Sequence, residues 1–222
     1  EQKQIVLLGS YDIKGKEDWW YPLYVKKLCP ELPHWKALIK CASLFEDSDT
    51  GRSTYFTGLW NYRDADLIRS LSLPFVIKRY TKEEHLWNML EKKIASKSPI
   101  ILLNWTPNWI DMKYEGEFVQ FPEFSPECET DPSWGLNPNM LFDCANNNVT
   151  SVAKVMWPPF AQKHPCAYEL LKRIQLTAQH ISHASLIYKE NNNQPDLAAS
   201  LWKEHYANDI KKWHNSNCTI QL

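Results

Sequence analysis

The strongest constraint on the fold is a helix followed closely by a strand in the middle of the chain. Residues 83–96 place Leu86, Trp87 and Leu90 at helical spacing, with acidic residues in the first turn and lysines in the last, as the helix dipole prefers. The apolar run PIILL at 99–103 follows, and a continuous run of this length is typical of a parallel strand covered on both faces. Helical and strand-like segments alternate elsewhere too, so the sequence predicts an α/β fold.

Other elements are expected from the same periodicities. Strands are expected at 5–9, 55–60, 75–79, 118–121 and 152–157, and helices at 18–28, 34–45, 63–71, 165–188 (one helix or a pair) and 196–213. The stretch 124–148 is expected to be a long loop that needs Cys128 and Cys144 to pin it. A chain of 222 residues is long enough for one large domain or two small lobes.

The charge balance argues against two classes of partner. Twenty-five Lys and Arg residues face 26 Asp and Glu residues, so the formal net charge is −1, and no excess of positive charge is present for a nucleic acid or an anionic membrane. The longest apolar runs, 5–8 and 99–103, are far shorter than the roughly 20 residues that span a bilayer. No signal-peptide pattern opens the sequence as given. We therefore expect a soluble protein with no nucleic-acid partner.

The cysteines indicate an oxidising compartment. All six lie outside C-x-x-C pairs, at positions 29, 41, 128, 144, 166 and 218. Proximity favours Cys29 with Cys41 and Cys128 with Cys144, which leaves Cys166 with Cys218, although other pairings and six free buried thiols stay open. The sequons at Asn148 and Asn217 are candidate glycosylation sites. Together these features favour a secreted or extracellular protein.

Catalytic and metal-binding motifs are missing from the sequence. It contains no G-x-S-x-G, H-E-x-x-H or G-x-G-x-x-G, and its six glycines could hardly form a phosphate-binding loop. His180 and His183 are spaced to share one face of a helix, but surface imidazoles without a metal are the favoured interpretation. We expect neither an enzyme nor a cofactor.

Aromatic residues are the unusual component, with 11 Trp beside only six Gly. Two aromatic segments follow expected strands: GLWNY at 58–62 and NWTPNW at 104–109. Ligands of open α/β sheets bind at the carboxyl ends of strands, and indole faces there can hold a quaternary ammonium group. Trp60, Trp105 and Trp109 are therefore candidates, with ordinary core packing as the alternative. Trp87 lies at helical core spacing and is assigned to packing.

A series of motifs carries a resemblance to a known family. In chain order they are WWYPLYV (19–25), CPEL (29–32), WKAL (35–38), ASLF (42–45), TGLW (57–60), PIILLNWTPNW (99–109), FAQKHP (160–165), AYELL (167–171) and LWKEHY (201–206). The series resembles that of the glycine betaine and choline substrate-binding proteins of bacterial ABC importers. Its most specific part is WTPNW.

The resemblance implies a type II periplasmic-binding-protein fold with two α/β lobes and a hinge. Residues 1–104 would be the second lobe, and residues 105–222 the hinge return and the C-terminal part of a first lobe. That first lobe would be incomplete, because the family's series begins with a further segment that holds one more cage tryptophan. A further segment or another chain would then be a partner.

The resemblance also implies roles for individual residues. Trp60 and Trp105 would be two walls of a tryptophan cage, the backbone N–H groups of Asn61 and Tyr62 would hold a ligand carboxylate, and Trp109 would pack behind the site. The expected function is non-enzymatic extracellular binding of a small quaternary ammonium ligand, such as choline or glycine betaine.

Two alternatives stay open. One is the ligand-sensing ectodomain of a membrane receptor or channel. A membrane receptor or transporter is accordingly a possible partner. The other is a secreted carbohydrate-active hydrolase with an aromatic platform, in which Asp111 and Glu115 near Trp109 would be the carboxylate pair.

Overall fold

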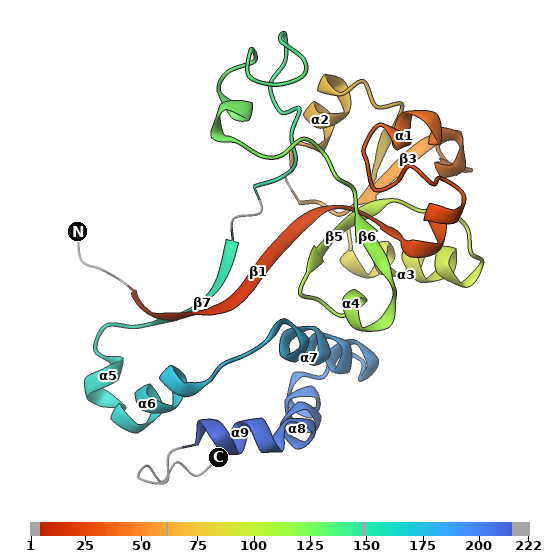
Figure 1. Ribbon diagram of the computed structural model, residues 1–222. Helices are drawn as coiled ribbons and strands as arrows, with labels where there is room; N and C mark the ends of the chain where they lie inside the picture. The colour runs from red at the N-terminus through yellow and green to blue at the C-terminus, as the bar shows by residue number, and fades with distance from the viewer. Residues whose placement is uncertain (1–4, 61, 148–149, 215–222) are drawn as a thin grey trace. The chain divides into compact units, whose positions relative to one another are not determined.

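The computed structural model describes residues 5–60, 62–147 and 150–214, and the chain divides into two compact units. Unit 1 comprises Glu1–Lys16, Thr106–Lys113 and Val149–Leu222, and unit 2 comprises Glu17–Trp105 and Tyr114–Asn148. Figure 1 labels the elements of both units. The chain passes between units after Trp105, but also after Lys16, Lys113 and Asn148. The expected division into lobes 1–104 and 105–222 stays a prediction.

Unit 2 contains most of a mixed sheet. Its strands are β2 (Glu46–Asp47), β3 (Arg52–Thr57), β4 (Val76–Arg79), β5 (Leu102–Thr106), β6 (Gly116–Phe118) and the second part of β1 (Val6–Pro22). The order is β2-β3-β5-β1-β6, with β4 paired to β3. Strand β3 runs parallel to β4 and to β5, with Phe56 opposite Leu102, whereas β1 and β6 are antiparallel. The expected α/β fold is confirmed.

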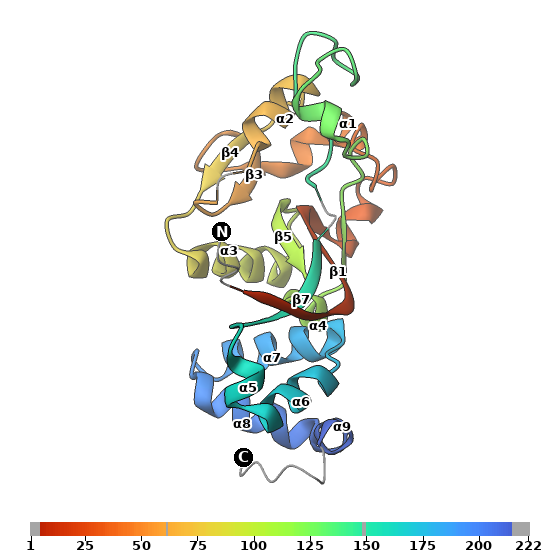
Figure 2. The ribbon, with the colours of Figure 1, turned by 90° about the vertical axis from the view of Figure 1, so that its left-hand side faces the viewer.

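Short helices accompany this sheet. They are α1 (Ala37–Lys40), α2 (Asp64–Ser70), α3 (Glu83–Ala95) and the 3-10 turns η1 (Leu23–Lys27), η2 (Ala42–Phe45) and η3 (Pro126–Glu129). Figures 1 and 2 show α3 alongside β5. Leu86 and Leu90 on α3 are completely buried, which confirms the apolar stripe expected there.

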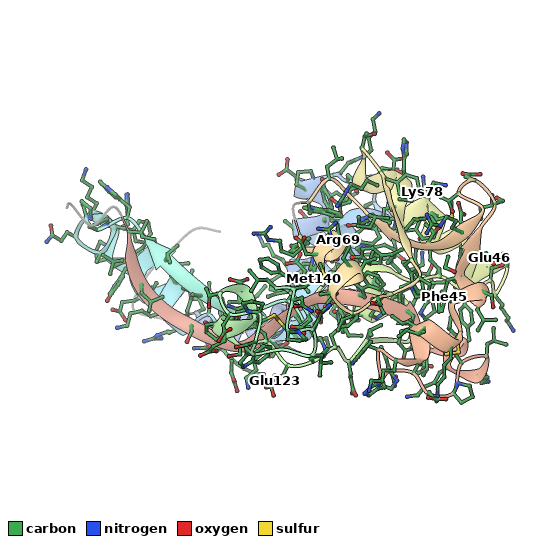
Figure 3. All side chains as sticks on the ribbon, turned by 90° about the horizontal axis from the view of Figure 1, so that it is seen from above. Phe45, Glu46, Arg69, Lys78, Glu123 and Met140 are labelled. Atoms are coloured by element: carbon green, nitrogen blue, oxygen red, sulfur yellow. A yellow bond between two sulfur atoms is a disulfide. The ribbon has the colours of Figure 1, made fainter. Side chains whose placement is uncertain are left out.

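The core of unit 2 is built on aromatic residues. Trp19 stacks on Tyr55 with ring centroids 3.9 Å apart, and its indole Nε1 donates a 2.8 Å hydrogen bond to Asp64 Oδ1. Phe45, labelled in Figure 3, belongs to the same buried cluster. Lys78, also labelled there, is half-buried, with its Nζ 3.1 Å from Asp47 Oδ1.

Unit 1 combines a strand pair with helices. The first part of β1 pairs antiparallel with β7 (Thr150–Met156). The helices are α4 (Ile110–Lys113), α5 (Phe160–Lys163), α6 (Pro165–Arg173), α7 (Ala178–Glu190), α8 (Pro195–His205) and α9 (Ala207–Trp213). Figures 1 and 2 show α5 to α9 grouped together. None of the helices in the described part of the chain is long and apolar enough to cross a membrane.

A buried lysine joins β7 to α6 in unit 1. The ammonium of Lys154 donates hydrogen bonds of 3.1 Å and 2.8 Å to the backbone carbonyls of Lys172 and Ile174, at the end of α6. Burial lowers the pKa of Lys154. A cation at the carboxyl end of a helix is favourable, so this contact offsets part of the cost of burying the ammonium.

Three expected helices were wrong in extent. Residues 18–22 belong to β1, and only the 3-10 turn Leu23–Lys27 follows. Residues 34–45 contain the short helix α1 and the 3-10 turn η2 instead of one long helix. The helix expected at 196–213 breaks at Tyr206 into α8 and α9. The segment 165–188 is a pair of helices, one of the two expected forms. The expected strands are present with ends shifted by a few residues, and the strand at 5–9 extends into β1.

Two expected disulfides are confirmed. Cys29 is bonded to Cys41, and Cys128 to Cys144, which pins the long loop at 124–148. Cys166 is also disulfide-bonded. Cys218 and the sequon residues Asn148 and Asn217 lie outside the described residues.

His180 is a structural residue of α7 and not the surface imidazole that was expected. The residue is only 7% exposed. Thr177 Oγ1 accepts a hydrogen bond from the His180 backbone N–H, and His180 Nδ1 accepts one from the Thr177 N–H, which together form a capping box. The other ring nitrogen of His180, Nε2, lies 3.5 Å from Asp209 Oδ2.

His183 lies in a second contact between α7 and the end of α8. Its Nδ1 is 3.1 Å from the Tyr206 hydroxyl, and its ring centroid is 4.5 Å from that of His205. Burial and the charge of His205 lower the pKa of His183, while Glu190 acts in the opposite direction. The His183 imidazole therefore takes up a proton less readily in the folded state than in the unfolded chain.

Acid should destabilise this contact in a way that depends on His183. Because the pKa of His183 is lowered on folding, its contribution is complete above the ordinary value of 6.5 and is lost as the pH falls below it. We expect His183→Gln to lose less free energy of unfolding than the wild type between pH 7.5 and pH 5.5 in urea denaturation. His214→Gln, which changes an exposed imidazole, is the control. Equal losses in wild type and His183→Gln would contradict the prediction.

Candidate functional site

Two of the predicted tryptophans meet at one edge of the unit 2 sheet. Strands β3 and β5 are parallel, so their carboxyl ends lie at the same edge. Trp60 follows β3, and Trp105 lies near the end of β5. Their ring centroids are 5.6 Å apart with an interplanar angle of 74°. Two half-buried indoles thus lie next to each other and nearly perpendicular.

Gly58 fixes the position of the Trp60 indole. A Cβ at position 58 would lie 2.6 Å from Cε3 of Trp60, closer than real Cβ contacts allow. The backbone of Gly58 therefore provides the surface on which the indole lies. Trp60 also packs against the buried core cluster of unit 2. Packing against Gly58 and the core cluster thus holds the Trp60 indole in place.

The ring faces of Trp60 and Trp105 differ from those of Trp109 in their electrostatic surroundings. Among the described residues, no Lys or Arg side chain lies over the ring of Trp60 or Trp105. Trp109, in unit 1, is 4% exposed, and its ring centroid lies 4.1 Å from Lys189 Nζ and 5.8 Å from Lys113 Nζ. Trp109 is thus a buried packing residue of unit 1, and its π system already has cationic partners within the chain.

The loop after Trp60 holds a neutral tyrosine. Asn61 lies outside the described residues. Tyr62 is half-buried and packs against the unit 2 core. Burial, together with a hydrogen bond to Glu17, raises the pKa of Tyr62 well above its ordinary value. The hydroxyl therefore stays protonated, so it adds no negative charge to this edge of the sheet.

Asp64 begins α2 just beyond this loop. The residue is 3% exposed, and its carboxyl group accepts the hydrogen bond from Trp19 Nε1. Burial raises the pKa of Asp64, although the donor Trp19 and the nearby Tyr55 hydroxyl oppose the shift. This residue anchors the end of the loop, and its role in the structure is to fix the course of the chain after Trp60.

Trp87 was missed as a residue of this edge. It was assigned to the core because of its helical spacing, and it is indeed 5% exposed. Its ring centroid nevertheless lies 5.5 Å from that of Trp105, with an interplanar angle of 61°. The sequence held one signal: Trp87 belongs to the helix that directly precedes the strand carrying Trp105. The site edge therefore contains three indoles in series.

Unit 1 contains a separate apolar cavity of about 460 Å³ between α7 and α8, with Ile181, Tyr188 and Trp202 in its lining. None of the predicted site residues lines it. The described residues also contain no group of three or more His, Cys, Asp or Glu side chains that could hold a metal ion.

Asp111, one member of the predicted carboxylate pair, has a structural role. Its Oδ2 accepts hydrogen bonds from Thr106 Oγ1 at 2.6 Å and from the Asn108 backbone N–H at 2.9 Å, where the chain enters α4. Asp111 lies in unit 1 and Glu115 in unit 2. Ser182 Oγ in α7 also donates to Asp111 Oδ2, at 3.4 Å, so the carboxylate joins the start of α4 to α7.

The fold defines a class of protein. A crystal structure of the glycine betaine/L-proline-binding protein ProX from Borrelia burgdorferi matches with a TM-score of 0.60 and 13% identity, over 97% of this chain and 72% of that one. Lactococcal OpuAC in its closed form with glycine betaine matches with a TM-score of 0.56 and 16% identity, over 95% and 71%. The fold is the α/β fold of periplasmic-binding-protein-type substrate-binding proteins.

Sequence comparison identifies the family. The profile of OpuAC, the substrate-binding domain of ABC-type glycine betaine transport systems, matches residues 1–205, so this chain belongs to that family. The trimethylamine N-oxide-binding protein of Pelagibacter ubique (strain HTCC1062) is 26% identical over 209 residues, which are 87% of this chain and 62% of that protein. The glycine betaine/carnitine transport binding protein GbuC of Listeria monocytogenes is 24% identical over 64% of this chain and 44% of its own length. The chain thus spans less than two thirds of both relatives.

The contact between Gly58 and Trp60 can be tested by a double-mutant cycle. We expect Gly58→Ala to lower the free energy of unfolding by about 1–3 kcal/mol, because the added methyl group displaces the indole from a packed position. In the Trp60→Ala background the same substitution should cost less than about 0.5 kcal/mol, because the obstructing ring is gone. Urea denaturation gives both values. An equal loss of free energy of unfolding in the two backgrounds would contradict the contact between Gly58 and the Trp60 indole as the reason for the glycine.

Proposed function

We propose that this chain binds a small quaternary ammonium ligand, such as choline, glycine betaine or a close relative, with Trp60 and Trp105 as two walls of the binding site. The observation that carries the proposal is the pair of nearly perpendicular indoles at the carboxyl ends of β3 and β5. Membership of the glycine betaine substrate-binding family supports the same ligand class. So does the choline complex of an ABC-transporter choline-binding protein, which matches with a TM-score of 0.56.

The chemistry of the ligand fits such walls. A quaternary ammonium group has no N–H to donate, so a protein recognises it by shape and by the negative face of aromatic rings. Indole faces that lack a lysine or arginine of their own are suited to this. Trimethylamine N-oxide, which the Pelagibacter relative is named for, has the same methylated nitrogen.

The number of walls limits the affinity. Each cation–π contact contributes about 0.5–2 kcal/mol, so two indoles supply at most about 4 kcal/mol, which corresponds to millimolar binding. Micromolar binding needs roughly 8 kcal/mol. We therefore propose that Trp60 and Trp105 are part of a larger site. The other part would come from the first lobe, completed by a further segment or another chain, and the hinge between lobes 1–104 and 105–222 would allow closure.

The proposed role is non-enzymatic and needs no cofactor. The engagement of Asp111 in starting α4 supports this choice over the hydrolase. Secretion to an extracellular compartment is proposed because the disulfides Cys29–Cys41 and Cys128–Cys144 require oxidising conditions. Delivery of the ligand to a transporter and ligand sensing by a receptor are both compatible with binding of this kind.

Binding can be measured by tryptophan fluorescence and by calorimetry with choline, glycine betaine and trimethylamine N-oxide. We expect saturable binding with a dissociation constant of about 1 mM, the strongest affinity that two indoles supply. Trp60→Ala and Trp105→Ala should each weaken it about 3–30-fold, because each removes one cation–π contact of about 0.5–2 kcal/mol. Trp134→Ala, which removes an exposed indole of the same unit, should leave the affinity unchanged.

A neutral ligand separates the cation–π contribution from shape. The alcohol 3,3-dimethylbutanol has the size of choline but carries no charge, so we expect it to bind at least about 5-fold more weakly. Equal binding of the two would mean that the site is merely apolar. No binding of any methylated ammonium compound at about 50 mM, well above the millimolar limit set by two walls, would refute the proposed function.

A further inference from the structure

The third indole of the site edge lies behind the binding walls. Trp60, Trp105 and Trp87 form a series in which neighbouring ring centroids are 5.6 Å and 5.5 Å apart, each pair edge to face. Trp60 and Trp105 are half-buried, whereas Trp87 is 5% exposed. A ligand can therefore reach the first two rings, while Trp87 acts on the site through Trp105.

A hydrogen bond fixes the orientation of Trp87. Its indole Nε1 donates to Glu83 Oε1 at 2.7 Å, across one turn of α3. The acceptor is a carboxylate, and hydrogen bonds to charged acceptors are shorter and stronger than neutral ones. On the buried face of the same helix, Leu86 and Leu90 are completely inaccessible to solvent. Packing of α3 thus fixes the backbone at Trp87, and the hydrogen bond to Glu83 restricts rotation of its ring.

The half-buried Trp105 depends on its neighbours for its own orientation. Edge-to-face contacts restrict a ring because the positive edge of one indole must face the negative face of the next. For Trp105 these contacts come from Trp60 and from Trp87. We propose that Trp87, held by Glu83, is a positioning residue that fixes the plane of Trp105 and so sets the affinity for a trimethylammonium group. This inference rests on the proposed function.

Two substitutions at position 83 isolate the hydrogen bond. Glu83→Ala removes the acceptor, whereas Glu83→Gln retains an oxygen that can accept from Trp87 Nε1. We expect Glu83→Ala to raise the dissociation constant for choline about 3–10-fold, within the range of one aromatic contact. Glu83→Gln should stay within about 2-fold of the wild type.

A third variant controls for helix stability. Glu84 is exposed and lies in the same first turn of α3, so Glu84→Ala removes the same favourable charge from the helix N-terminus without touching Trp87. It should leave the affinity unchanged. Near-UV circular dichroism provides a second readout, since it reports the mutual orientation of indoles. We expect its spectrum to change in Glu83→Ala and not in Glu84→Ala.

The outcomes separate this inference from the function on which it rests. If the wild type binds choline and Glu83→Ala binds it within about 2-fold, the positioning role is overturned and the proposed function stands. If Glu84→Ala weakens binding as much as Glu83→Ala, the effect comes from helix stability and the positioning role is again overturned. If the wild type binds no methylated ammonium compound, the proposed function fails and the ligand role of Trp87 fails with it.

Discussion

The stack of Trp19 on Tyr55 joins three elements of unit 2 through one buried side chain. Trp19 lies in β1 and Tyr55 in β3, with ring centroids 3.9 Å apart. The indole N–H of Trp19 then reaches Asp64 at the start of α2. The loop between β3 and α2 carries Trp60, so both ends of that loop are tied to the same indole. The contacts of Trp19 with Tyr55 and Asp64 therefore help to fix the position of Trp60 in the proposed site.

Burying the Asp64 carboxyl group costs free energy, and this cost favours one path for the loop between β3 and α2. Asp64 is almost completely buried, and burial raises its pKa even though the Trp19 N–H favours the ionised form. A buried acceptor without its donor costs about 1–3 kcal/mol, and a charged one costs more. A shift of β1 or α2 that separated Trp19 from Asp64 would leave the buried carboxyl group without this donor. The pair therefore selects one position for the loop among those that hydrophobic packing alone would allow.

Periodicity predicted some elements of this fold and misassigned others for a clear reason. Helix α3 has one apolar stripe, and the apolar run 99–103 leads into β5 (Leu102–Thr106), so both elements were predicted, although the strand lies three residues further along the chain. In β1, by contrast, Trp19, Trp20 and Tyr21 are all buried, so the strand lacks the alternation that identifies one. Spacing also placed Trp87 correctly on a buried face. It could not show that the neighbour on that face is Trp105, because the contact depends on how α3 packs beside β5.

The same limit applies to the roles of the tryptophans, which residue type alone does not distinguish. Lys189 lies 4.1 Å from the ring of Trp109, and Lys163 lies 4.8 Å from that of Trp157, so these indoles have cations of their own chain as partners. A bound ligand would have to displace such a lysine before it could use the ring. Trp60 and Trp105 carry no such partner among the described residues, and an external cation would gain the full contact. Local charge thus separates Trp60 and Trp105 from Trp109 and Trp157, although all four are indoles.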